Sequence, residues 1–351
     1  MGRQNWFDVV GQEHLHVRAH AGVFDQSSFA KYELSGPGAP AALEAICANR
    51  VAREVGRLTY TQLLNSRGGI ECDLTVARLA EDHFYIVTRT GFRSHDFGWI
   101  ADHLPAQGVT FRDVTEDWGT LSLMGPKARD ILARVTSADV SNSALPFGSA
   151  QEIILAATPV RALRVTYVGE LGWELHVPIA ALGAVYDALM ATDPQLKPVG
   201  YRALESLRLE KGYRAWSSDI TPNDTPFEAG LGWAVKLKSG IPFLGREALV
   251  ARQTQPLQKL FAGFTVTDPK AVLVGRETIL RDGQPVGYLT SGGYGYTIGR
   301  SIGYGYVRAE AGVTEDWLQS GTYALVIAGE ETPAELASGA LHDPGNLRVR
   351  A

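Results

Sequence analysis

The sequence predicts an α+β fold, because strand-like and helix-like segments follow one another along 351 residues without a low-complexity tract or a repeat of solenoid period. Residues 71–79 alternate between apolar and polar side chains, as in a half-buried strand. Residues 201–211 have the pattern of a helix. Beyond Arg246 the chain changes to short strands broken by glycine, which indicates a β-rich terminal domain.

Local signals place the other elements. Leu43, Ile46 and Cys47 share one side of an expected helix, Gly125-Pro126 puts a proline at a helix start, and Asp282-Gly283 indicates a tight hairpin. The expected elements are, in order, a strand at 31–35, a helix at 37–49, a hairpin of strands 71–79 and 84–88, a strand at 120–124, a helix from 125 to 135, a hairpin of strands 161–168 and 173–177, helices at 180–190 and 201–211, and a hairpin of strands 279–280 and 286–288.

Composition bounds the class of protein. A chain with 45% hydrophobic and 20% charged residues can bury a large core, and this length favours two or three domains. A net charge of -5 gives no nucleic-acid footprint, and no apolar run approaches the roughly 20 residues of a membrane helix. The first residues lack the apolar core of a secretory signal, and Cys47 and Cys72 form no CxxC motif. We therefore expect a cytoplasmic protein.

The segment from Tyr167 to Leu175 sets a tyrosine and a glutamate seven residues apart across a glycine-punctuated turn. Trp173 and Leu175 share a side of the second expected strand, which places Glu174 on the opposite face. A carboxylate can accept two hydrogen bonds from adjacent N–H groups of a flat ring while a tyrosine contacts that ring. The pair therefore favours a nitrogen-rich ring such as a pterin as the ligand, against the ordinary surface position of a lone glutamate.

The segment from Tyr60 to Val76 reads as a strand, a glycine turn and a second strand, with Asp73 on its polar face. Taken alone, that pattern is equally typical of a hairpin with solvated acids.

Other blocks accompany these two motifs: Asn5-Trp6-Phe7, Gly22 to Phe29, Ser206 to Arg214, Asp219 to Pro222, Thr225 to Trp233, Phe243 to Arg246 and His342-Asp343-Pro344. Together, and in this order, they resemble the folate-binding aminomethyltransferase family, which contains the glycine cleavage T-protein. The resemblance covers essentially the whole chain. It is closest to the carboxy-terminal folate half of dimethylglycine and sarcosine dehydrogenases.

The resemblance implies an α+β fold of three lobes arranged like a clover leaf, with ferredoxin-like or Greek-key lobes and a C-terminal β-barrel or jelly-roll-like lobe. It implies a discontinuous folate-binding lobe of residues 1–45 and 118–249, an inserted lobe of residues 46–117 that carries the catalytic aspartate, and a barrel-like lobe of residues 250–351.

The resemblance also implies the site residues. Asp73 falls on the family's catalytic aspartate, and Tyr60, Arg89, Tyr167 and Glu174 fall where the family binds tetrahydrofolate. A fixed carboxylate can orient the folate nitrogens and the amine substrate and can stabilise developing positive charge. We therefore expect Asp73 to act through electrostatics and proton transfer rather than as a covalent nucleophile.

Three positions depart from the family pattern. Cys72 precedes Asp73 where many T-proteins carry a second aspartate, and Arg89 stands where T-proteins more often carry asparagine. An arginine there fits a folate or substrate carboxylate, and it also fits an ordinary surface position. Leu204 replaces an arginine that contacts the folate tail in T-proteins, which leaves the tail-binding groups unassigned.

Other cofactors find weak support. His14, His16 and His20 include an i, i+4 pair on an expected helix, but no neighbouring cysteine or acid completes a ligand set, so we expect a helical surface and no metal site. The glycines from Gly292 to Gly295 miss the dinucleotide spacing and precede no helix, so we expect no flavin or nicotinamide site in this chain.

The resemblance leaves four hypotheses of function. In the first, the chain takes the one-carbon unit that a separate FAD-dependent oxidoreductase makes from an N-methylated amine such as dimethylglycine or sarcosine, and the product is 5,10-methylenetetrahydrofolate. In the second, it moves a methyl group from nitrogen, oxygen or sulfur directly to tetrahydrofolate. The third is glycine cleavage with a lipoyl carrier protein. The fourth is a non-catalytic folate-binding subunit, which does not explain the retained Asp73.

Overall fold

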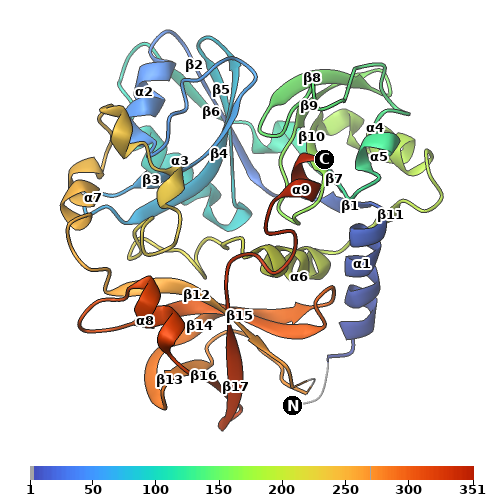
Figure 1. Ribbon diagram of the computed structural model, residues 1–351. Helices are drawn as coiled ribbons and strands as arrows, with labels where there is room; N and C mark the ends of the chain where they lie inside the picture. The colour runs from blue at the N-terminus through green and yellow to red at the C-terminus, as the bar shows by residue number, and fades with distance from the viewer. Residues whose placement is uncertain (1–3, 269) are drawn as a thin grey trace.

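The computed structural model describes residues 4–268 and 270–351, which form two sheets and a closed barrel (Figure 1). The first sheet consists, in spatial order, of β11 (Lys197–Pro198), β1 (Gly22–Asp25), β7 (Trp118–Met124), β10 (Gly172–Pro178), β9 (Thr158–Leu163) and β8 (Ala150–Leu155). All its neighbouring strands are antiparallel except β1 and β11. The α+β prediction is confirmed.

The second sheet is antiparallel and carries the segment with Asp73. Its strands are, in spatial order, β3 (Leu58–Leu64), β4 (Ile70–Ala80), β5 (His83–Thr88), β2 (Ala30–Ser35) and β6 (Thr110–Asp113). The predicted hairpin is present, with Glu81 and Asp82 between β4 and β5. Residues 30–35 form β2 of this sheet, whereas the sequence analysis assigns residues 1–45 to the other lobe. The domain bounds stay a prediction.

The carboxy-terminal part closes into a six-stranded barrel, as the family resemblance implies. Its strands are, around the barrel, β12 (Lys259–Val266), β15 (Arg300–Arg308), β14 (Gln284–Gly295), β13 (Thr278–Arg281), β16 (Tyr323–Ile327) and β17 (Glu330–Ala337). The pairing of β12 with β17 closes it.

The helices of the described residues are α1 (Phe7–Ala19), α2 (Ala39–Ile46), α3 (Arg93–Asp102), α4 (Ala128–Leu132), α5 (Leu182–Met190), α6 (Tyr201–Lys211), α7 (Arg246–Arg252), α8 (Glu315–Ser320) and α9 (Leu347–Arg350), with short 3-10 turns between them. The helix predicted from 125 to 135 is wrong in extent, since Gly125 adopts a φ of 137° beside the backbone of α1 and regular helix forms only in α4.

Helix α6 lies between the three units (Figure 1). Leu204 and Leu207 pack with residues of α1 and the first sheet, whereas Leu209 packs against Phe261 and Ile302 of the barrel. A helix that is apolar on more than one side is buried, and α6 therefore joins α1 and the first sheet to the barrel.

The turn between β13 and β14 contains Gly283, whose contribution to the stability of the barrel can be measured by substitution. Asp282 and Gly283 have φ values of 52° and 77°, the left-handed pair that two-residue hairpins require. A Cβ on Gly283 would meet no atom within 4 Å, so Gly283→Ala adds backbone strain alone and should cost about 1 kcal/mol of unfolding free energy. Gly183→Ala in α5, also in open space, should stabilise by up to about 1 kcal/mol. Urea unfolding of both variants checks the opposite signs, and equal shifts would contradict the strain argument.

Candidate active site

Asp73 lies on β4 opposite Gln62 of β3. The amide nitrogen of Gln62 donates to Asp73 Oδ1 at 3.1 Å. Tyr60 stands two residues before Gln62 on the same face of β3, and its hydroxyl interacts with the Asp73 carboxylate. The alternation of β4 sends Cys72 and Leu74 into the core, which leaves Asp73 on the partly exposed face.

The surroundings of Asp73 raise its pKa from 3.8 to about 6. Burial is the largest cause, because protein atoms crowd a carboxyl group that keeps only partial contact with solvent. Tyr60 and Gln62 oppose the rise as hydrogen-bond donors, and the guanidinium of Arg214 opposes it by its charge. Burial and the neighbouring Asp73 in turn raise the pKa of Tyr60. Asp73 is therefore an acid that can exchange a proton near neutral pH.

Because the pKa of Asp73 is raised, replacing Asp73 by a neutral residue should increase the free energy of unfolding, and the increase should depend on pH. The folded protein binds the proton of Asp73 more tightly than the unfolded chain, so the contribution of Asp73 to stability is full below its ordinary pKa and is lost as the pH rises through about 6. Asp73→Asn should therefore raise the unfolding free energy by on the order of 1–3 kcal/mol at about pH 7.5 and hardly at about pH 4. Denaturant unfolding at both pH values checks it, and an equal change at both would contradict the assignment.

Aromatic side chains flank the Asp73 group. Trp233 stacks on Tyr60 with ring centroids 5.7 Å apart, although 72% of Trp233 is exposed. Arg89 follows β5 and donates from Nη1 to the backbone carbonyl of Trp216. Trp216 packs edge-on against Phe92 at 5.5 Å.

Tyr167 does not extend a strand, which corrects the prediction of a strand from 161 to 168. β9 ends at Leu163, and residues 164–171 form a loop in which Gly169 has a φ of 78°. The Tyr167 hydroxyl donates to the backbone carbonyl of Arg214 at 3.0 Å, and its ring stacks on Tyr213 at 5.9 Å. Because the side chain of Arg214 acts on Asp73 by charge, the segment from Tyr213 to Arg214 links Tyr167 to the Asp73 group.

Glu174 lies on β10 on the face opposite Trp173, as predicted, and its side chain is 18% exposed. His176 Nε2 lies 3.6 Å from Glu174 Oε2. Burial lowers the pKa of the Lys31 ammonium group to about 8, and the charge of Glu174 opposes that change. Among the described residues, these contacts place Glu174 in a second polar group, separate from the contacts that join Asp73, Tyr60, Arg214 and Tyr167.

A hydrogen-bonded cluster lies behind Asp73. Asp96 accepts from the Thr88 hydroxyl at 2.5 Å and pairs with His95 Nδ1 at 2.9 Å, and the Thr88 hydroxyl also donates to the backbone carbonyl of Asp73 at 3.3 Å. Cys72, His95 and Asp96 each bring one potential ligand atom to within 4.8 Å of the others. These hydrogen bonds join the backbone of Asp73 to Thr88 and Asp96, so the cluster supports the strand that carries Asp73.

His14 corrects the expectation of a helical surface. Its ring is fully buried, with Nδ1 at 2.8 Å from the Ser206 hydroxyl and Nε2 at 2.9 Å from that of Thr297. Burial lowers its pKa, and Nε2 lies 3.3 Å from the carboxylate of Glu210. This histidine therefore joins α1 to α6 and the barrel.

Two cavities open elsewhere on the described part of the chain. One of about 620 Å³ lies between α1, α6 and the barrel, lined by residues that include Trp6, Tyr294 and Tyr296. The other, of about 900 Å³, is lined in part by Arg50, Arg53 and Trp233. Neither includes any of the five residues predicted from the sequence. The second approaches them through Trp233, which stacks on Tyr60, and the first through Tyr201 and Glu205, which both act electrostatically on Tyr167.

The structure adds residues that the sequence analysis did not assign to the site. Gln62, fully buried, donates its amide to Asp73 while its carbonyl oxygen lacks a hydrogen-bond partner among the described residues. The indole nitrogen of Trp216 lacks one in the same sense. The signal for Gln62 was its spacing from Tyr60, because residues i and i+2 of a strand share a face. Arg214 belongs to the segment from Ser206 to Arg214 that resembles the family, but no local pattern indicated its proximity to Asp73.

The sheets, the central helix and the closed barrel define a three-part α+β protein of aminomethyltransferase type. Comparison with known protein families gives the same result. The GCVT N-terminal domain family matches residues 2–239, and the glycine cleavage T-protein C-terminal barrel domain family matches residues 259–343. The chain therefore belongs to the aminomethyltransferase (glycine cleavage T-protein) family of folate-dependent enzymes.

Individual relatives support the same assignment. Mitochondrial sarcosine dehydrogenase of Homo sapiens is 40% identical over 98% of the chain, and mitochondrial dimethylglycine dehydrogenase of Mus musculus is 35% identical over 87%. The chain spans only 39% and 35% of the lengths of those two proteins. An aminomethyltransferase of Saccharopolyspora erythraea is 33% identical over 93% of the chain and 88% of its own length.

The solved structure of glycine cleavage system aminomethyltransferase T from Bartonella henselae superposes with a TM-score of 0.85 at 28% identity, covering 95% of this chain and 90% of that one. The T-protein-like fold is confirmed. In addition, no helix among the described residues is both long and apolar enough to cross a membrane.

Proposed function

We propose that the chain is a tetrahydrofolate-dependent one-carbon transferase. It accepts the one-carbon unit that a separate FAD-dependent oxidoreductase makes from an N-methylated amine of the dimethylglycine or sarcosine type. The product is 5,10-methylenetetrahydrofolate. When bound, tetrahydrofolate supplies the two nitrogens that take up the carbon.

One observation carries this proposal: a carboxyl group with a pKa of about 6, held on β4 beside Tyr60 and Gln62. An anion that is positioned before the reaction stabilises positive charge that develops on an amine or on a reacting nitrogen. The same group can accept a proton at neutral pH. Binding without chemistry would gain little from an acid in that place, which argues against a purely folate-binding subunit.

The polar and aromatic groups fit a reduced pterin. The carboxylate of Glu174 offers two acceptor oxygens to the adjacent N–H groups along one pterin edge, and the Tyr167 ring offers an aromatic face. The carbonyl oxygen of Gln62, next to Asp73, has no hydrogen-bond partner in the described part of the chain, which supports an N–H donor on the ligand at that point. A buried acceptor without a partner is costly, and a ligand donor relieves that cost.

Arg89 suits the carboxylate of the folate tail or of the amine substrate. Its guanidinium carries five N–H donors, of which a single nitrogen contacts the Trp216 carbonyl. Bidentate pairing with a carboxylate is the typical use of such a group. In this chain Arg89 would take over part of the role of the arginine that Leu204 replaces.

The choice of an oxidised amine as carbon source rests on the relatives. The matched parts of sarcosine and dimethylglycine dehydrogenases correspond to the two T-protein domains, and this chain carries no dinucleotide-binding fingerprint. Glycine cleavage is the second candidate, because the S. erythraea aminomethyltransferase and the B. henselae protein match over nearly their whole lengths.

The test is an anaerobic incubation of the protein with tetrahydrofolate and a panel of N-, O- and S-methylated small metabolites, with and without a dimethylglycine- or sarcosine-oxidising flavoprotein. We expect methylenetetrahydrofolate, resolved by mass, above the uncatalysed background only when both proteins are present. Production of 5-methyltetrahydrofolate without the flavoprotein would establish direct demethylation instead. Turnover only with an aminomethyl-lipoyl carrier would establish glycine cleavage, and folate binding without any product would indicate a binding subunit.

A further inference from the structure

The segment of residues 341–350, here named the C-terminal strap, leaves the barrel after β17 and ends in α9 beside the first sheet (Figure 1). It passes directly over the end of α6. The backbone N–H groups of Leu341 and His342 both donate to the carbonyl of Glu210 at 2.9 Å. Lys211 Nζ donates to the Asp343 carbonyl at 2.7 Å and to Asn346 Oδ1 at 2.8 Å. The strap is therefore fixed along the helix that joins the first sheet to the barrel.

The strap also holds Glu170, in the loop that carries Tyr167. Glu170 is fully buried and accepts from three cationic or ionisable side chains, two of which belong to the strap. His342 Nε2 lies 3.0 Å from its Oε1, and Arg348 Nε donates to its Oε2 at 2.7 Å. The third partner is Arg18 of α1, at 3.0 Å. A buried carboxylate with this number of donors has one strongly preferred position.

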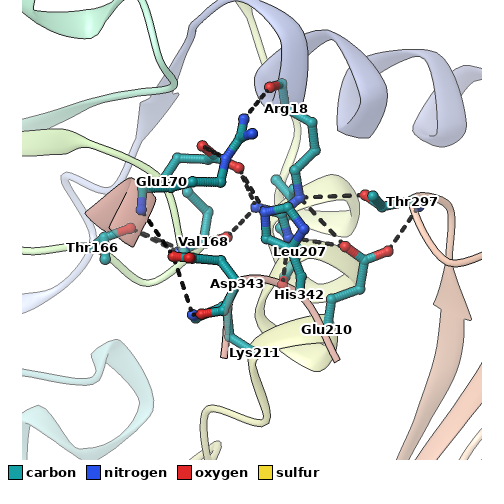
Figure 2. A network of polar contacts seen from close by, with 12 residues as sticks. Arg18, Thr166, Val168, Glu170, Leu207, Glu210, Lys211, Thr297, His342 and Asp343 are labelled. Carbon is teal, nitrogen blue, oxygen red and sulfur yellow. Dashed lines mark hydrogen bonds and ion pairs between the residues drawn. The ribbon is translucent and has the colours of Figure 1, made fainter. Parts of the chain in front are cut away.

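Figure 2 shows Arg18 and Lys211 in one polar network, in which Arg18 contacts the loop at Val168 and Glu170 and Lys211 contacts Asp343 of the strap. Arg18 Nη1 donates to the Val168 carbonyl at 2.6 Å, and Arg18 Nη2 donates to Glu210 at 3.0 Å. Gly169 packs so closely on Lys211 that a Cβ would lie 2.2 Å from Lys211 Cγ. Burial opposes ionisation of Glu210, but the donors from His14, Arg18 and Thr297 outweigh it and lower its pKa to about 2.

Tyr167 lies between these restraints. The carbonyl of its neighbour Val168 accepts a hydrogen bond from Arg18. Glu170, three residues after Tyr167, accepts a hydrogen bond from Arg348 of the strap. The ring can keep its contact with Tyr213 and its hydrogen bond to Arg214 only while the loop keeps this path. None of the strap residues belongs to the groups around Asp73 or Glu174.

We propose that the C-terminal strap is a positioning element that orders the loop of residues 164–171 and thereby presents the Tyr167 ring to the folate ligand. His342 and Arg348 are positioning residues in this sense, because they act through Glu170. The inference rests on the proposed function for its ligand. Its geometric part, the ordering of the loop, does not depend on any ligand.

Arg348 is the residue to change, because its side chain is 40% exposed and its loss should leave the fold intact. The matched control is Arg350→Met in the same helix, whose residue is exposed and forms no ion pair among the described residues. In ligand-free Arg348→Met, amide hydrogen exchange of residues 164–171 should rise about 3- to 10-fold, whereas Arg350→Met should leave it unchanged.

Tetrahydrofolate affinity should follow the loop. If loosening reduces the fraction of molecules with a competent loop by about 3- to 10-fold, the apparent Kd rises by the same factor and kcat changes by less than about twofold. Arg348→Lys, which keeps the charge, should recover part of the affinity. A merely structural role predicts a lower melting temperature without this split between Kd and kcat.

Three results would overturn the inference: unchanged loop exchange in Arg348→Met, faster exchange with unchanged Kd, or equal effects in Arg350→Met. A wild-type protein that binds no tetrahydrofolate would instead overturn the proposed function, and with it the role of the loop in folate binding. The exchange comparison in ligand-free protein would then still decide whether the strap orders the loop, so the two failures are distinguishable.

Discussion

Asp73→Asn is expected to lower folate-dependent turnover by about 10²–10³-fold while the Kd for tetrahydrofolate changes by less than about threefold. Asparagine keeps the shape of the side chain and a hydrogen-bonding oxygen for Gln62, but it holds no negative charge and accepts no proton. The interaction that it removes is one made chiefly with charge that develops during the reaction. Such a loss lowers kcat and kcat/KM together.

Glu71→Gln is the matched control, since Glu71 precedes Asp73 by two residues on the same face of β4 but contacts Asn65 and His95 instead. It should leave kcat within about threefold of the wild type. Turnover is measured under anaerobic conditions with the flavoprotein in excess, and binding by calorimetry. An Asp73→Asn protein that retains wild-type turnover, or that loses folate binding instead, would remove Asp73 from the chemistry.

The pH profile gives an independent sign. Because burial raises the pKa of Asp73 to about 6, the wild type should lose activity as the pH falls below about 6 and the carboxylate becomes protonated. The residual activity of Asp73→Asn should lack that limb. A wild-type profile that stays flat from about pH 5 to 8 would contradict a reactive carboxylate with this pKa.

Local patterns predicted the Asp73 strand well because its restraints are local. Apolar residues at every second position of β4 fix which face is buried, and a two-residue turn joins β4 to β5. The same logic placed the turn at Asp282 and Gly283, where the left-handed backbone favours that residue pair. The opposite faces of Trp173 and Glu174 followed from strand alternation in the same way.

Tyr167 was misplaced because its restraints are distant in the sequence. The loop that replaces the expected strand is held by Glu170, whose partners Arg18 and Arg348 lie 152 and 178 residues away. No window of local sequence contains that information. His14 illustrates the same limit, since its burial depends on Ser206 and Thr297, 192 and 283 residues along the chain.

Gln62 and Arg214 differ in how far local sequence predicts their positions beside Asp73. The position of Gln62 opposite Asp73 follows once the register of β3 and β4 is known, and only the turn between those strands had to be placed correctly. Arg214 reaches Asp73 from beyond α6, after a left-handed Gly212 that redirects the chain. The electrostatic effect of Arg214 on Asp73 depends on the three-dimensional fold, and no local pattern in the sequence predicts it.

Glu174→Gln is expected to raise the Kd for tetrahydrofolate by about 10- to 100-fold and to change kcat much less. Hydrogen bonds to a charged acceptor contribute about 1.5–3 kcal/mol, and an amide replaces one of the two acceptor oxygens by a donor that faces the N–H groups of the ligand. The effect should therefore fall on binding, in contrast to that of Asp73→Asn. The two variants together separate a group that holds the ring from a group that acts on the reacting carbon.

Lys31 supplies the internal check on the Glu174 variant. Burial already lowers the pKa of Lys31 to about 8 and Glu174 counteracts this, so removal of the carboxylate should lower that pKa further and destabilise the fold somewhat. Binding must therefore be measured well below the melting temperature of the variant. Glu152→Gln, an exposed acid on β8 of the same sheet, controls for loss of one negative charge and should leave the Kd unchanged. If Glu174→Gln binds tetrahydrofolate within about twofold of the wild type, the ring is held by other groups, and Tyr167 loses its expected partner.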